Sequence, residues 1–97
     1  MEPWQYYLDE LQRRAARIPL RALGGAELLA EAAHDAYQAT TNHLTETGWD
    51  EEHALVITRL FGQSVKAWMA RGTQDWDALR AELEQRYTDW TTQRNEG

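Results

Sequence analysis

The three histidines are the side chains best suited to chemistry, and all lie in or beside a segment rich in carboxylates. Glu31 and His34 are three residues apart, and Asp50 and His53 repeat this spacing. Paired Glu-x-x-His motifs hold the metals of di-iron carboxylate bundles. On a helical wheel, however, Glu31 and His34 lie on the solvent side of their expected helix. The first and last segments of the chain also offer no convincing inward carboxylates, so we do not expect a di-metal centre.

His43 and His53 form a second candidate pair. Each is five residues from Gly48, so an antiparallel helical hairpin folded about this glycine would bring the two rings to facing positions. With Glu46 or Asp50 close by, the rings could bind a transition metal such as zinc or share a proton. Hydrogen bonds to each other, to the backbone or to water are the ordinary roles of such rings. We therefore expect no cofactor, and name His43 and His53 as candidates for a small metal or ligand site.

No enzyme motif is present in the sequence. The chain has no cysteine, and Ser64, its only serine, lies on the apolar side of an expected helix with no histidine one turn away. Gly24 and Gly25 lack the following Lys and Ser/Thr of a phosphate-binding loop. The carboxylates lie on solvent faces, where no burial would raise a pKa for acid–base catalysis. We predict a protein that is not an enzyme.

Charge is the most informative feature of the sequence. The net charge is −6, and residues 26–58 hold seven carboxylates but no Lys or Arg. A surface of one sign raises the association rate of an oppositely charged partner, although solvated charges also keep a protein in solution. Exposed aromatic residues are enriched at interface hot spots, which adds Trp49 to this surface. We predict that a basic protein partner binds the following residues: Glu27, Glu31, Asp35, Glu46, Trp49, Asp50, Glu51 and Glu52.

Other partners are conceivable from the same pattern. The acidic segment of one chain could meet the arginines near the start of another, Arg13, Arg14, Arg17 and Arg21. A helical homodimer could instead bury surplus aromatic residues such as Tyr37 and Trp90. Nucleic acid requires a basic stripe, which an acidic chain with an isoelectric point near 4.9 does not favour. Small acidic bundles of this type serve as inhibitors, immunity proteins, antitoxins and adaptors, which is an analogy of type alone.

These residues must be positioned by helices, because apolar residues recur at helical spacing in four segments and nowhere alternate as in a strand. Gly48 is the expected C-cap of the second helix, Asp50 the N-cap of the third, and Thr73 or Asp75 the N-cap of the fourth. Short connections favour antiparallel neighbours. The sequence predicts an all-α fold, a small antiparallel bundle of four helices, over about 3–18, 26–47, 50–71 and 74–92.

The chain is long enough for one domain, residues 1–97, and we expect a frayed tail over 91–97. The linker over 19–25 would let the first helix pack in its own bundle or on a neighbouring chain. We find no signal peptide at the start and no apolar run that could span a membrane. The absence of cysteine fits a cytoplasmic protein, and the preference for arginine over lysine is typical of a GC-rich bacterial genome.

Overall fold

The computed structural model describes residues 1–18, 25–71 and 75–96. These residues form helices and contain no strand, so the predicted all-α class is confirmed. Along the chain, the helices are α1 (Pro3–Ala15), α2 (Gly25–Glu46), α3 (Glu51–Ala70) and α4 (Trp76–Glu96).

The helix boundaries agree with the sequence predictions in the middle of the chain and differ at its two ends. Helix α1 ends at Ala15, before the predicted end at residue 18. Helix α4 runs to Glu96, so most of the segment expected to fray is helical. The predicted linker lies outside the described residues, apart from Gly25 at the start of α2.

Local capping explains where the helices begin. Before α1, the backbone N–H of Glu2 donates to Gln5 Oε1 (2.8 Å), and Pro3 needs no hydrogen-bond partner for its nitrogen. Asp50 caps α3 as predicted, because its Oδ2 accepts the N–H of His53 at 3.3 Å. Asp75 caps α4, since its Oδ1 accepts the N–H groups of Asp77 (3.1 Å) and Ala78 (3.2 Å).

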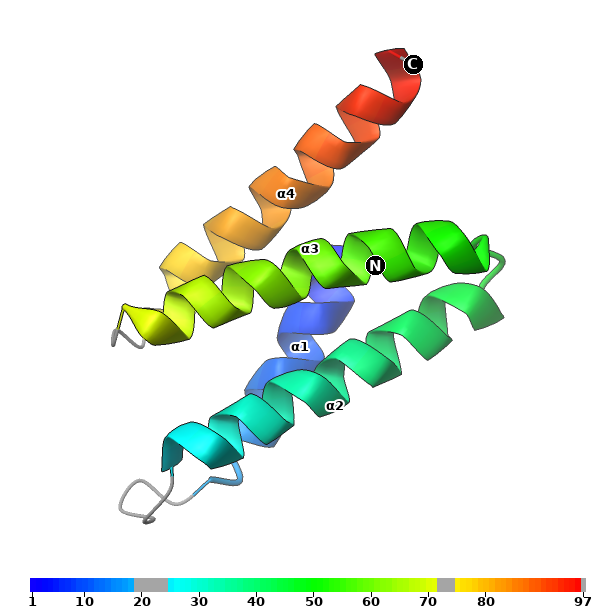
Figure 1. Ribbon diagram of the computed structural model, residues 1–97. Coiled ribbons are helices and arrows are strands. Elements are labelled where there is room, and N and C mark those ends of the chain that lie inside the picture. Colours follow the sequence, from blue (N-terminus) through cyan, green and yellow to red (C-terminus); the bar gives the residue numbers. More distant parts are fainter. Residues whose placement is uncertain (19–24, 72–74, 97) are drawn as a thin grey trace.

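The turn between α2 and α3 depends on a glycine. Gly48 has a φ of 102°, a conformation that residues with a side chain rarely adopt. The next N–H, that of Trp49, donates to the carbonyl oxygen of Leu44 (2.9 Å) and closes the end of α2. This turn makes α2 and α3 the antiparallel hairpin that the sequence predicted (Figure 1).

The four helices pack in a closed order. Helix α1 lies against α2 and α4, while α3 lies against α2 and α4 in turn. The first helix therefore packs within its own chain. In Figure 1, α4 diverges from α3 toward its C-terminus. No helix in the described ranges is both long and apolar enough to cross a lipid bilayer.

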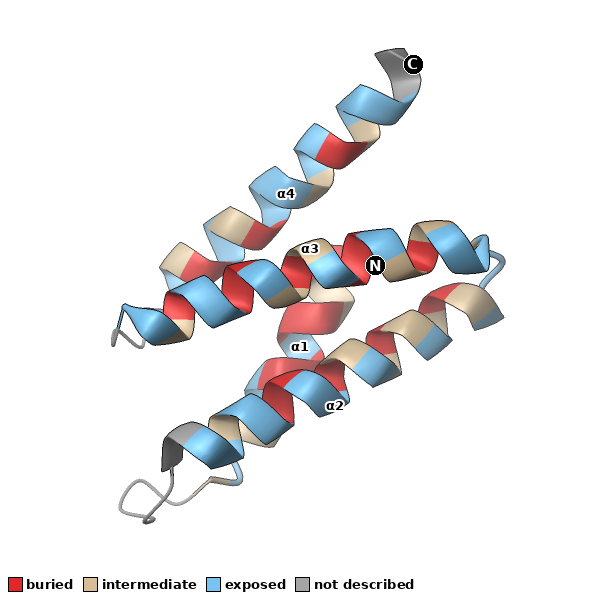
Figure 2. Cartoon of the chain, viewed as in Figure 1, coloured by how far each residue is buried: buried red, intermediate tan, exposed pale blue. Residues whose placement is uncertain are grey.

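The core lies between the inward sides of all four helices (Figure 2). Tyr7 also reaches across it, because its hydroxyl donates to the carbonyl oxygen of Ala33 at 3.3 Å. Leu28 was predicted to face the core but is 37% exposed. The buried apolar residues are Trp4, Tyr7, Leu8, Leu11, Ala32, Ala33, Ala36, Leu44, Ala54, Ile57, Phe61, Val65, Trp68, Leu79, Leu83 and Trp90.

Candidate partner-binding surface

The outer side of α2 carries four of the predicted contact residues: Glu27, Glu31, Asp35 and Glu46. At 3.6 residues per turn, these four positions fall within an arc of about 100° around the helix axis. All four are exposed to solvent, and Gln38 and Asn42 lie in the same arc and are exposed as well. We call this surface the acidic face; it consists of Glu27, Glu31, Asp35 and Glu46.

Three further carboxylates lie at the turn between α2 and α3. Asp50, Glu51 and Glu52 are all exposed, and we call them the acidic tip. They occupy the N-cap and the first turn of α3, where the positive end of the helix dipole favours negative charge. The acidic tip therefore has a local role in stabilising α3, whatever else it does.

Helix stability does not explain the acidic face in the same way. Glu46 lies in the last turn of α2, where the negative end of the helix dipole disfavours a carboxylate. Glu31 and Asp35 lie in the middle of the helix, beyond the reach of either end. Only Glu27 lies in the first turn, where a negative charge is favourable. Apart from Glu27, the carboxylates of the acidic face therefore have no stabilising position at a helix end.

Within the described part of the chain, no ion pair involves a carboxylate of the acidic face. The acidic tip has one weak partner, because His53 Nδ1 lies 3.9 Å from Asp50 Oδ2. The other ion pairs join Arg13 and Arg14 to Glu10, and Arg71 to Glu82 (2.9 Å). Among the described residues, the arginine–carboxylate pairs thus lie on other helices, and the carboxylates of the acidic face are exposed to solvent.

Trp49 is only half-exposed, because it packs on another helix. Its ring stacks on that of Trp90 in α4, with centroids 5.5 Å apart and planes inclined by 18°. The ring of His53 meets the Trp90 ring edge-on, with centroids 6.0 Å apart. The guanidinium of Arg94 also lies over Trp90, with its Cζ 4.8 Å from the ring centroid. Trp49 therefore packs against α4 while remaining half-exposed next to the acidic tip in the sequence.

The two candidate histidines contact different helices. His43 stacks on Tyr6 of α1, with centroids 3.9 Å apart and nearly parallel planes. His53 lies against Trp90 of α4. No ring contact joins the two histidines, although the hairpin itself forms as predicted. Among the described residues, no three His, Cys, Asp or Glu side chains come together as a group that could hold a metal.

The first Glu-x-x-His pair lies where the helical wheel placed it. Glu31 and His34 are both exposed on α2, and the ring of His34 lies parallel to that of Tyr37, with centroids 6.3 Å apart. Tyr37 itself is half-buried against the core. Neither member of the pair points into the bundle, where a di-metal centre would be built.

Sequence reasoning missed a charged cluster on α1. Glu10 is only 7% exposed, and its carboxylate accepts hydrogen bonds from Arg13 and Arg14. Burial by itself would raise the pKa of Glu10, but the hydrogen bond from Arg14 and the charges of both arginines outweigh burial and lower it. Burial, the negative charge of Glu10 and a hydrogen bond to it raise the pKa of Tyr6. The spacing of three and four residues was the available signal for these pairs.

This cluster bears on the idea that the acidic segment meets arginines of a second copy. Arg13 and Arg14 already serve the buried carboxylate of their own helix. Arg17 is exposed, and Arg21 lies outside the described residues. Two of the four arginines predicted as a basic group near the start of the chain, Arg13 and Arg14, are therefore already paired within α1.

Comparison with known proteins adds no functional information. No family model, no curated protein and no solved structure matches this chain.

Proposed function

We propose that this protein is a non-catalytic interaction protein of the inhibitor, immunity, antitoxin or adaptor type, which binds a basic surface of a partner protein. The acidic face of α2 would supply the main contact, and the acidic tip would extend it. The observation that supports this proposal most strongly is the set of exposed carboxylates along α2 that form no ion pair among the described residues. Apart from Glu27, helix stability does not require them.

The physics of such a surface predicts how binding behaves. Carboxylates that gather on one side steer a basic partner toward that side and raise its association rate. Because the charges are exposed, salt screens them, and the affinity should fall as ionic strength rises. Trp49, half-exposed beside the acidic tip, would add an apolar contact at one end.

The test compares two charge reversals of equal size. In the first variant, Glu31→Lys and Asp35→Lys reverse the centre of the acidic face. In the control, Glu84→Lys and Asp89→Lys reverse two exposed carboxylates of α4 and give the same net charge. We avoid reversing the acidic tip, because positive charge in the first turn of α3 would also weaken that helix.

The wild-type chain and both variants are immobilised, and proteins captured from cells of the source organism are identified by mass spectrometry. The proposal expects a basic protein that the wild type and the control retain and that elutes at raised ionic strength. We expect the α2 variant to bind that protein at least about tenfold more weakly, since each rim charge affects association. Equal retention by the two variants, or no basic protein specific to this chain, would overturn the proposal.

Self-association is the alternative, and its expected interface is largely occupied. Trp90 is 9% exposed under Trp49 and Arg94, and Tyr37 is half-buried in its own chain. The exposed large apolar residues in the described ranges are Met1, Leu28 and Val56, which lie before α1, on α2 and on α3. A homodimer through an apolar interface would persist in both charge-reversal variants, so native mass spectrometry separates it from the leading proposal.

Localisation and a candidate metal site can be inferred from the sequence in the same way. We place the protein in the cytoplasm, because a chain without cysteine suits a reducing compartment. A metal or ligand site at His43 and His53 would be the third alternative, and it would need a further ligand. If such a site existed, removing metal with a chelator would lower the stability of the purified protein.

A further inference from the structure

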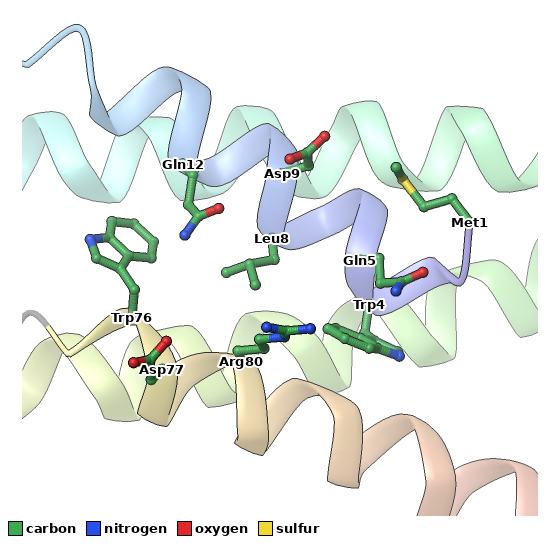
Figure 3. Close-up of a pocket in the computed structure, with 9 residues that line it drawn as sticks. All are labelled: Met1, Trp4, Gln5, Leu8, Asp9, Gln12, Trp76, Asp77 and Arg80. Atoms are coloured by element: carbon green, nitrogen blue, oxygen red, sulfur yellow. The ribbon is translucent and has the colours of Figure 1, made fainter.

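An open groove lies between α1 and the first turns of α4, away from the acidic face. Its volume is about 430 Å³, which is within the range of small-ligand sites. Figure 3 shows Leu8 pointing from α1 toward α4, with Trp76 on one side and Trp4 on the other. These three side chains give the groove apolar walls, and no residue of α2 lines it.

The α4 side of the groove carries two opposite charges. Asp77 and Arg80 both line it, are exposed and lie three residues apart on the same helix. The Arg80 guanidinium lies over the Trp4 ring, with Cζ 5.8 Å from the centroid. Neither residue belongs to an ion pair among the described residues. The groove therefore presents a cation and an anion that form no ion pair with each other.

From this geometry we propose that the groove binds a small zwitterion with an apolar body, of which an apolar α-amino acid is the simplest example. The ligand's carboxylate binds the guanidinium of Arg80, which can donate two parallel hydrogen bonds. Its ammonium group lies near Asp77. The apolar body contacts Leu8 and Trp76.

The spacing of the two charges favours one ligand that carries both. Side chains three residues apart on a helix have Cβ atoms roughly 5–6 Å apart, so both can reach charged groups on one small molecule. A simple carboxylate would meet repulsion from Asp77, and a simple amine would meet repulsion from Arg80. The groove is thus expected to reject ligands with a single charge, and its role is independent of the acidic face.

The probe is phenylalanine, titrated into the full chain and followed in amide proton–nitrogen correlation spectra and by calorimetry. Phenethylamine lacks the carboxylate, and hydrocinnamate lacks the amine, so they serve as matched ligands. We expect phenylalanine to shift the amide signals around Leu8, Trp76 and Arg80. We expect each ligand with one charge to bind at least about tenfold more weakly, because one charge-assisted hydrogen bond is lost.

Variants of the groove provide the second arm. Arg80→Gln and Asp77→Asn should each weaken phenylalanine binding by at least about tenfold. Arg86→Gln, which removes an exposed charge of α4 outside the groove, should leave binding unchanged. Circular dichroism confirms that each variant keeps its helices. Absence of signal shifts up to the solubility limit of phenylalanine overturns the proposal, as does equal binding of the three ligands or of the three variants.

Discussion

Helices α1 and α2 lie against each other, and their charged residues are used in opposite ways. In α1, Glu10 is nearly buried and accepts hydrogen bonds from Arg13 and Arg14 of the same helix. On α2, the carboxylates of the acidic face are exposed and unpaired among the described residues. The paired charges of Glu10, Arg13 and Arg14 therefore belong to the fold, whereas the carboxylates of the acidic face remain available to another molecule.

The two helices also differ in the size of the side chains that they bury. Helix α1 buries large side chains, among them Tyr7 and Leu11, in only 13 residues. Helix α2 is longer and buries chiefly alanines, such as Ala32 and Ala36, which let its neighbours approach closely. A residue of α1 thus contributes more buried surface to the core than a residue of α2. Helix α1 therefore contributes mainly to the core, while α2 contributes less to the core and exposes a charged side.

The largest expected effect comes from replacing a leucine by alanine on each helix, which compares how much α1 and α2 contribute to the core. Leu11→Ala removes a fully buried side chain of α1 and should lower the free energy of unfolding by about 2–5 kcal/mol. Leu28→Ala removes a side chain of α2 that is 37% exposed, so its cost should be well below that of Leu11→Ala. Chemical denaturation measures both. Equal costs would show that α2 anchors the bundle as strongly as α1.

An intermediate effect is expected from the paired charge of α1. Glu10→Gln should lower the free energy of unfolding at neutral pH by roughly 1 kcal/mol, because the ionised acceptor of two arginines is lost. The pKa of Glu10 is lower in the folded protein than its ordinary value of 4.5. Its contribution is therefore complete above that value and disappears as the pH falls through the folded pKa.

Denaturation of the wild type and of Glu10→Gln across the acid range tests whether the contribution of Glu10 to stability is lost as the pH falls. The two stability curves should differ at neutral pH and approach each other in acid, below pH 4.5. Glu31→Gln on α2 is the control, and at neutral pH its free energy of unfolding should lie within about 0.5 kcal/mol of the wild type. A constant gap between wild type and Glu10→Gln would mean that the charge of Glu10 does not contribute.

The smallest effect concerns the acidic face itself. Neutralising its centre with Glu31→Gln and Asp35→Asn should change the free energy of unfolding by less than about 0.5 kcal/mol. Any change should be a gain, because repulsion among neighbouring carboxylates decreases. Added salt should stabilise the wild type slightly more than this variant, since salt screens that repulsion. A large loss of stability in thermal unfolding would give these carboxylates a role in the fold.

Much of the bundle could be predicted because its signals are local. Residues within a few positions of one another determine the four helices, the cap at Asp50, the turn at Gly48 and the outward side of α2. The error at Leu28 has a different origin. Periodicity shows which side of a helix faces inward, but it does not show how far the neighbouring helices extend to cover that side.

The sequence alone determined the helical class, the caps and the concentration of carboxylates between residues 26 and 58, because helix formation and charge depend on near neighbours. Tertiary structure decided which side chains from different helices meet. It placed Trp49 on Trp90, His43 on Tyr6, and the walls of the groove between α1 and α4. These contacts depend on the packing of large side chains across the bundle, and no spacing within one helix encodes them.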